Sequence, residues 1–170
     1  MATSSITPLG ALARGIVAGF VGTAVMDGYQ KLVSTLRDSG SHDSDDSEGT
    51  RDWSKAPAPA QVGRRIVKGV FRRDVSGDYI DLLTNVVHWT YGISWGGLYG
   101  ILKPSLSTSS LWSGPTFGGA VWGAGYVVLP AMKLYKPIWE YPPQTLALDL
   151  SYHLVYGLGV AGVFEALEEV

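Results

Sequence analysis

The chain of 170 residues carries a formal net charge of −2, which is too small to favour nucleic acid as a partner. It contains no cysteine, which excludes a disulfide framework, a thiolate metal site and a cysteine nucleophile. Its composition is 46% hydrophobic, and its mean hydropathy of +0.13 is modest for a membrane protein because residues 34–81 are polar. Local windows of sequence are therefore more informative than the mean.

Four stretches of the chain are apolar over roughly 20 residues, the length that crosses a bilayer. The first lies within residues 1–33, and the other three lie within residues 82–170, at about 82–102, 114–134 and 146–167. Because the first stretch continues past Asp27 without a small-residue cleavage site, we interpret it as a retained span and not as a signal peptide. The pattern predicts an all-α integral membrane four-helix bundle. A soluble bundle with unusually apolar helices is the alternative.

The loop between the first two predicted spans has two parts. Residues 34–60 are acidic and serine-rich and then alternate Ala with Pro, a composition typical of a flexible segment. Residues 61–81 contain a basic amphipathic segment, in which apolar and basic residues take opposite faces of a short helix. We expect this helix to lie on the membrane surface and to bind anionic lipid headgroups through Arg64, Arg65, Lys68, Arg72 and Arg73. An ordinary solvated helix packed on the loop side of the bundle is the alternative interpretation.

The positive charges are distributed unevenly between the two sides of the predicted bundle. Eleven of the 13 Lys and Arg residues fall in the first and third loops, and only Arg14 and Lys103 lie on the opposite side. Because cytoplasmic loops of membrane proteins are enriched in Lys and Arg, this count places both of those loops in the cytoplasm and both termini outside.

The predicted spans also resemble one another in pairs. The second and fourth share the phrase His-x-x-Tyr-Gly, which begins at His88 and again at His153. The first and third can be superposed by aligning Gly22 with Gly123. A duplicated two-helix hairpin, repeated in parallel, accounts for both matches.

Small residues recur every four positions along all four predicted spans. Lipid tails provide no hydrophobic drive between helices, so association rests on close backbone approach, which such seams permit. The glycines that we expect at helix–helix contacts are Gly15, Gly19, Gly92, Gly96, Gly119, Gly123 and Gly157.

Three ionisable residues lie on these seams, namely Asp27, His88 and His153. Counted along the helices, each is very roughly 10 Å from the first-loop side, so the three can meet inside the bundle. An ionisable group at that depth is costly unless it is paired, which makes it a candidate functional group. We expect a polar intramembrane site that also includes Tyr91, Tyr156 and Asp149.

Three interpretations of this site stay open. In the first, neutral histidines form structural hydrogen bonds across the seams. In the second, Asp27 and the histidines pass protons or coordinate a moving ion. In the third, the two histidines on facing helices hold haem or a metal, although no metal ligand is assigned and no cofactor is expected. Asp149 and His153 lack the second histidine of a zinc-protease motif, so hydrolysis is not indicated and an enzyme is not expected.

The second half of the chain carries a recognisable order of motifs. A histidine-bearing span is followed by a Gly-rich span ending Val-Leu-Pro130, then by the loop Lys136-Pro-Ile-Trp-Glu-Tyr-Pro-Pro143, and then by a span opening Leu148-Asp-Leu-Ser-Tyr-His153. This order resembles the YagU-like family of small bacterial inner-membrane proteins of unknown function. The resemblance implies a multi-pass protein of the bacterial inner membrane and supplies no reaction. It also implies that the first loop lies outside, which conflicts with the charge count.

Together these patterns predict a multi-span inner-membrane protein with a polar intramembrane site for protons or small solutes. The first alternative is a non-catalytic structural or accessory membrane subunit, and the second is a haem- or metal-binding membrane protein. The expected partner is the lipid bilayer, and a homo- or hetero-oligomer stays open.

Overall fold

The computed structural model describes residues 7–38, 52–105 and 109–169, and within these ranges the chain is all helical, without a strand. The prediction of an all-α fold is confirmed. Within the described ranges, the α-helices are α1 (Pro8–Asp38), α2 (Ala58–Phe71), α3 (Ile80–Leu102), α4 (Ser110–Ala131) and α5 (Pro143–Glu168). Three short 3-10 turns connect them, at Gly77–Tyr79, Lys103–Ser105 and Ile138–Glu140.

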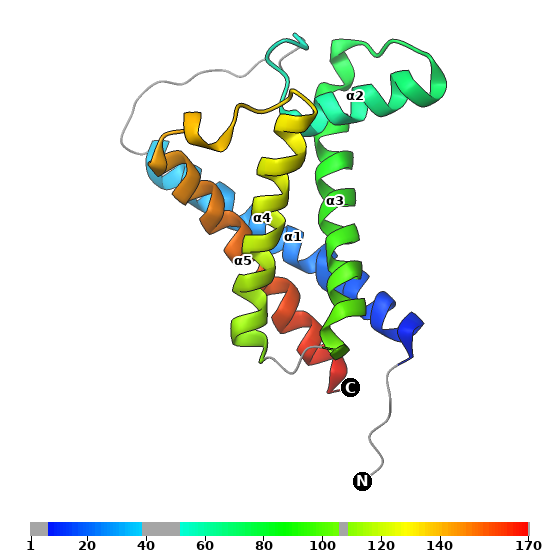
Figure 1. Cartoon of the computed structure of the whole chain (residues 1–170), viewed down its shortest axis with the longest axis vertical. Helices are drawn as coiled ribbons and strands as arrows, with labels where there is room; N and C mark the ends of the chain where they lie inside the picture. Colours follow the sequence, from blue (N-terminus) through cyan, green and yellow to red (C-terminus); the bar gives the residue numbers. More distant parts are fainter. Residues whose placement is uncertain (1–6, 39–51, 106–108, 170) are drawn as a thin grey trace.

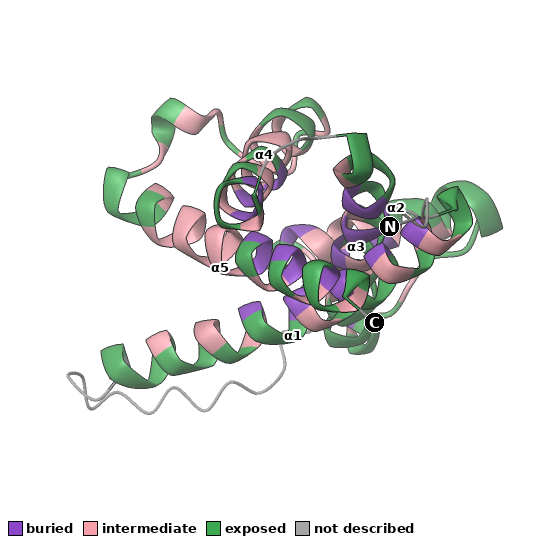
Figure 2. Cartoon of the chain, turned by 90° about the horizontal axis from the view of Figure 1, so that it is seen from below, coloured by how far each residue is buried: buried purple, intermediate pink, exposed green. Residues whose placement is uncertain are grey.

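The four long helices are arranged in contacting pairs (Figure 1). α1 packs against α3, and α4 packs against α5, while α1 and α5 also pack against each other and join the two pairs. α3 and α4 form no comparable contact with each other, although both run between the same two ends of the molecule. Buried residues gather where the long helices cross, and their outer faces are exposed (Figure 2).

Two helices in the described part of the chain are long and apolar enough to cross a membrane, Pro8–Arg37 within α1 and Pro143–Glu168, which is α5. Both coincide with predicted spans. α3 and α4 lie where the second and third spans are expected, but their many Gly, Ser, Thr, Trp and Tyr residues keep their hydropathy below the same level. Length and hydropathy do not by themselves separate a span from a buried core helix, so the four-span bundle stays a prediction.

The crossing of α1 and α3 is a seam of glycines, as predicted. A Cβ added at Gly19 would lie 2.9 Å from the Cα of Gly96 and from the carbonyl oxygen of Gly92. One added at Gly15 would lie 2.9 Å from the Cα of Gly100. Because real Cβ atoms essentially never come this close, only glycine allows the two backbones to approach in this way.

The crossing of α4 and α5 is built in the same manner but uses different glycines from those predicted. A Cβ at Gly157 would lie 2.7 Å from the backbone nitrogen of Gly118, and one at Gly114 would lie 3.0 Å from the carbonyl oxygen of Gly157. Gly119 and Gly123 were expected at this contact, but a Cβ added at either would meet nothing within 4 Å. That part of the prediction is wrong, because the contacting face of α4 is displaced from the expected one.

The contacts also set the register between the two helix pairs. Gly19 lies against the turn of α3 that begins at Gly92, and Gly114 lies against the corresponding turn of α5 at Gly157. Gly19 therefore corresponds to Gly114, and the expected alignment of Gly22 with Gly123 is wrong by six residues. The similarity of the two pairs is what a repeated hairpin would give, and duplication itself stays a prediction.

The second part of the first loop packs against the start of α3. α1 continues to Asp38, beyond residue 33, and residues 39–51, which hold most of the acidic stretch, lie outside the described residues. Ala56 and Ala60 are buried against Ile80, at the start of α3. The amphipathic helix α2 begins at Ala58 and ends at Phe71, so Arg72 and Arg73 follow its last turn. Figure 1 shows α2 lying across the end of α3.

The end of α4 offers a test of backbone strain. Lys133 follows the helix with a φ of 55°, and its N–H donates to Pro130 O at 2.8 Å while that of Leu134 donates to Leu129 O at 2.9 Å. This pair of bonds is the Schellman motif, which usually has glycine at the left-handed position. We expect Lys133→Gly to raise the free energy of unfolding by about 1 kcal/mol, because a Cβ is unfavourable in that conformation.

Thermal unfolding of the purified protein in detergent measures this change. Lys133→Ala is the matched control, since it removes the same charge and retains the Cβ. Equal melting temperatures for the two variants would contradict the prediction.

Candidate functional site

A cavity of about 390 Å³ lies between α3 and α4, in the half of the molecule nearer to α2. α1 and α5 contribute to its walls, and Pro59 and Val62 from the start of α2 bound it at one end. The predicted site residues that line it are His88, Tyr91, Asp149, His153 and Tyr156. The cavity exists because α3 and α4 are each packed on a different partner and do not close on each other.

Asp27 is the predicted site residue that does not line the cavity, and it instead pairs with a residue that does. Its Oδ1 atom lies 3.0 Å from Nε2 of His88, which joins α1 to α3. The two side chains are 27% and 29% exposed, respectively, so the contact is shielded by the helices on both sides. The seam of small residues brings these two groups together, because it holds α1 and α3 at short distance.

His153 is held by its own helix. Its Nδ1 atom lies 2.8 Å from the backbone carbonyl of Asp149, one turn earlier in α5. A carbonyl can only accept, so Nδ1 carries the hydrogen of this bond. The carboxylate of Asp149 lies farther away, with Oδ1 at 3.7 Å from Nδ1.

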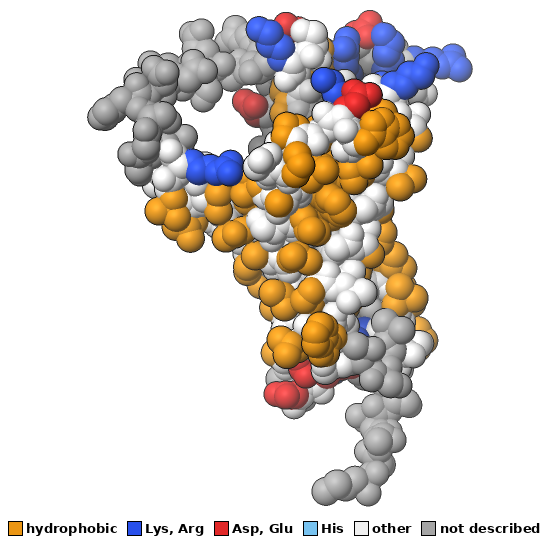
Figure 3. Space-filling model, turned by 60° about the vertical axis from the view of Figure 1, so that its left-hand side comes forward, with side chains coloured by type: hydrophobic (Ala, Val, Ile, Leu, Met, Phe, Trp, Pro, Cys, Tyr) orange, Lys and Arg blue, Asp and Glu red, His pale blue; other side chains and the backbone are white. Residues whose placement is uncertain are grey.

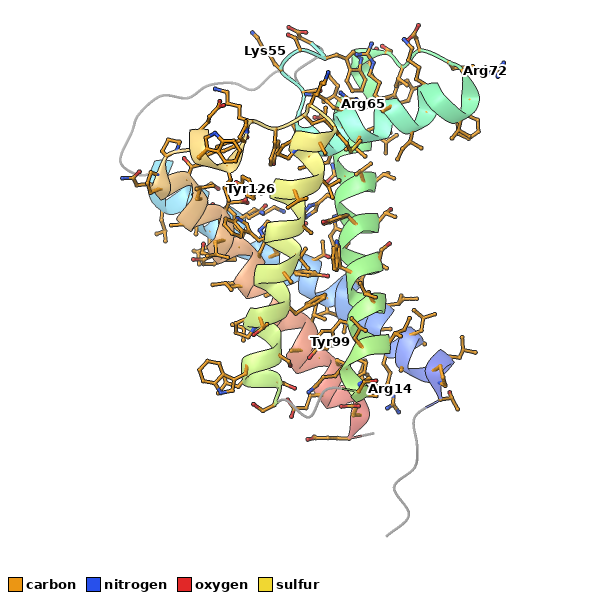
Figure 4. The ribbon with its side chains drawn as sticks, in the orientation of Figure 1. Arg14, Lys55, Arg65, Arg72, Tyr99 and Tyr126 are labelled. Carbon is orange, nitrogen blue, oxygen red and sulfur yellow. The ribbon has the colours of Figure 1, made fainter. Side chains whose placement is uncertain are left out.

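The carboxylate of Asp149 is positioned by α4. Its Oδ2 atom accepts a hydrogen bond from the hydroxyl of Tyr126 at 3.0 Å, and Figure 4 shows Tyr126 in the half of α4 nearer to α2. Tyr126 in turn packs against Tyr135 and Tyr141, with ring centroids 5.7 and 5.6 Å away. Burial and the nearby carboxylate of Asp149 both raise the pKa of Tyr135, which follows α4.

The two predicted tyrosines have different surroundings. Tyr156 is 2% exposed, and its hydroxyl donates to the carbonyl of Gly92 at 2.6 Å, so it links α5 to α3. Tyr91 is 43% exposed and lies edge-on to Trp95, with ring centroids 5.9 Å apart. Tyr156 is therefore part of the packed structure, whereas Tyr91 presents a ring at the edge of the cavity.

An aromatic cluster closes the gap between α3 and α4 beyond the cavity. Tyr99 of α3 and Ser113 of α4 share a hydrogen bond of 2.9 Å between their hydroxyls. Phe117 packs between Tyr99 and Tyr156, with centroid distances of 4.9 and 6.0 Å. Phe164 packs on Tyr99 from α5 and is fully buried. The space between α3 and α4 is consequently filled at the end away from α2 and hollow at the end near it.

Several residues of the cavity were not among the predicted site residues. Trp95, Trp122, Tyr126 and Tyr135 all line it. The indole nitrogen of Trp122 is buried and has no hydrogen-bond partner among the described residues. The sequence does contain one indication of this aromatic wall, because Trp122 and Tyr126 are one helical turn apart within a run of small residues.

The predicted membrane-surface residues lie at one end of the molecule, where Figure 4 shows Arg65 and Arg72. Arg65 donates to the backbone carbonyl of Met132, so α2 is tied to the end of α4. Lys68 forms an ion pair with Asp74 at 2.8 Å, and this hydrogen bond and charge hold the pKa of Asp74 below its usual value. On the opposite face of α2, three large apolar side chains are exposed by more than half, namely Ile66, Val70 and Phe71.

The acidic residues and histidines of the site are joined in pairs. Within the described ranges of the chain, no group of three or more His, Asp or Glu side chains is placed to hold a metal ion. The structure joins Asp27 to His88 and Asp149 to His153, and both histidines line the cavity. It does not bring Asp27 to His153, so the predicted single cluster is resolved into two pairs.

Comparisons of the chain with protein-family models, with curated proteins and with solved structures found no match.

Proposed function

We propose that this chain is a multi-span protein of the bacterial inner membrane, similar to the YagU-like family, in which α1, α3, α4 and α5 all cross the bilayer. The exposed surface supports the proposal. The most apolar 18-residue window of α5 is only 22% buried, whereas the core helix of a soluble protein is mostly buried. Large apolar side chains such as Phe20, Val86 and Val127 are exposed by about half or more. Exposed apolar surface of this extent is stable when it contacts lipid.

The charges support an orientation with α2 on the cytoplasmic side. In Figure 3, most of the visible Lys and Arg side chains gather at one end of the molecule, beyond a surface rich in hydrophobic side chains. Figure 4 shows Lys55, Arg65 and Arg72 at that end and Arg14 at the other. Positive charge of this distribution is retained on the cytoplasmic side. The resemblance to the family implies the opposite orientation, and the proposal follows the asymmetry of charge.

Within this bundle, we propose that the cavity binds a small solute and exchanges protons with the α2 side. The observation that carries the proposal is that one cavity is lined by His88, His153 and Asp149, which come from two different helices. Nδ1 of His153 lies 2.8 Å from the backbone carbonyl of Asp149, and the carboxylate of Asp149 lies beside the same ring. Ionisable side chains that line a cavity within a membrane bundle are the groups from which proton relays are built.

Proton flux in liposomes tests this function. The full chain is reconstituted around a pH-sensitive dye, a pH gradient is imposed, and the membrane potential is collapsed with potassium and valinomycin. We expect the wild type to dissipate the gradient faster than empty liposomes, and His153→Ala to return the rate to that of empty liposomes. Gly123→Ala is the matched control, because Gly123 lies on α4 away from helix contacts and should leave the flux unchanged.

A separate observation supports the structural alternative, in which the polar residues hold the helices together. Asp27–His88 joins α1 to α3, and Tyr156–Gly92 joins α5 to α3, so both polar contacts connect helices. If wild-type liposomes behave as empty ones and His153→Ala only lowers the melting temperature, the polar residues serve packing. The chain would then be a structural or accessory subunit, and a stoichiometric protein should co-purify with it.

A further inference from the structure

The walls of the cavity have an unusual balance of charge. Of the described residues that line it, Asp149 is the one with a formal charge at neutral pH apart from the two titratable histidines, and none is Lys or Arg. Arg65, which lies nearby, is directed to the carbonyl of Met132. An anionic solute would therefore meet a carboxylate with no fixed positive charge to offset it.

The polar atoms that Asp149 and His153 leave available are acceptors, whereas the indole N–H of Trp122 is a donor without a partner among the described residues. Oδ2 of Asp149 accepts from Tyr126, and Oδ1 has His153 Nδ1 at 3.7 Å, which is beyond hydrogen-bond distance. Neutral His153 uses its N–H on a backbone carbonyl, so its Nε2 presents a lone pair. The Asp149 side chain is 32% exposed and lines the cavity. A solute with positive charge satisfies these atoms better than a neutral or anionic one.

The rest of the cavity is aromatic and apolar. Six aromatic rings line it, namely Tyr91, Trp95, Trp122, Tyr126, Tyr135 and Tyr156. The face of an aromatic ring is electrically negative and attracts ammonium groups, Trp most strongly. Aliphatic side chains such as Val121 and Leu129 complete the walls. Such walls do not replace the hydration shell of an inorganic ion, but they match the apolar surface of an organic one.

We propose that the solute is a small organic cation with an ammonium group and an apolar or aromatic body. Its charge lies at Asp149, and its body packs between the rings of α3 and α4. The volume of about 390 Å³ falls within the range of small-molecule sites, about 300–1,000 Å³. This inference rests on the proposed function, in that the cavity must be a solute site, and it adds the chemical class of the solute.

Binding to the full chain in detergent tests the inference, with Trp95 and Trp122 as fluorescent reporters in the cavity wall. The probes are benzyltrimethylammonium and its uncharged isostere neopentylbenzene, which have the same shape and differ in charge. We expect saturable quenching by the cation and none by the isostere. Asp149→Asn, which keeps the side-chain shape, should weaken cation binding at least tenfold, and Glu140→Gln on the exposed loop should leave it unchanged.

The outcomes separate this inference from the proposed function. Equal binding of the two probes would overturn the choice of a cation while supporting a solute cavity. Saturable binding of neither probe would overturn the inference, and the proton flux of the wild type would still decide the proposed function independently. If Asp149→Asn does not fold, the comparison of the two probes on the wild type alone decides whether the cavity prefers a cation.

Discussion

Gly96→Ala is expected to lower the free energy of unfolding by about 1–3 kcal/mol, the cost of forcing extra atoms into a packed contact. The added Cβ would lie 2.6 Å from the carbonyl oxygen of Gly15 and from the backbone nitrogen of Gly19. These are backbone atoms of another helix, so no side-chain rotation can relieve the overlap. α1 and α3 must move apart, and the Asp27–His88 contact above the crossing should lengthen with them.

The measurement is thermal unfolding in detergent, followed by circular dichroism. Gly157→Ala tests the second crossing, where the added Cβ would lie 2.7 Å from the backbone nitrogen of Gly118. Gly119→Ala and Gly123→Ala are the matched controls in α4, because both face open space. The controls should be neutral or more stable by up to about 1 kcal/mol, since alanine is the better helix former. Similar losses for all four variants would show that close crossings do not hold the helices together.

The α1–α3 crossing could be predicted from the sequence, whereas the face of α4 could not. In α1, the phase of Gly15 and Gly19 contacts α3, and the adjacent phase of small residues contacts α5 through Gly22, so small residues on either phase meet a helix. In α4, glycines stand at Gly118 and Gly119 in succession, and Gly114 is followed by Pro115. Two adjacent phases are then equally small, and the choice between them depends on how α5 approaches.

The histidines of the candidate site could be predicted from the sequence, whereas the shape of the cavity could not. His88 and His153 stand out in the sequence because ionisable groups are rare in apolar helices. Their separation into two pairs follows from which helices contact each other, and no periodicity within one helix contains that information. The cavity arises from the missing contact between α3 and α4, so its aromatic walls at Trp95 and Trp122 become evident only when all four helices are placed.

A double-mutant cycle on Asp27 and His88 is expected to give the second large effect. Each single change to alanine should cost about 1–3 kcal/mol, because it leaves the other polar group partly buried without its partner. The double variant should be more stable than the sum of the two losses predicts, with a coupling of about 0.5–3 kcal/mol. The contact distance of 3.0 Å and the shielding by both helices argue for a coupling within this range.

Unfolding of the four proteins in detergent gives the coupling, and Glu140→Gln is a control on an exposed residue outside the pair. Losses that simply add would mean that the two groups do not interact in the folded chain, and the pairing of α1 with α3 would then rest on the glycine seam alone. A clear coupling together with unchanged proton flux in Asp27→Ala would assign the pair to structure. The proton-exchanging role would then belong to His153, whose contact lies within α5, and to Asp149, which lines the cavity and accepts a hydrogen bond from Tyr126 of α4.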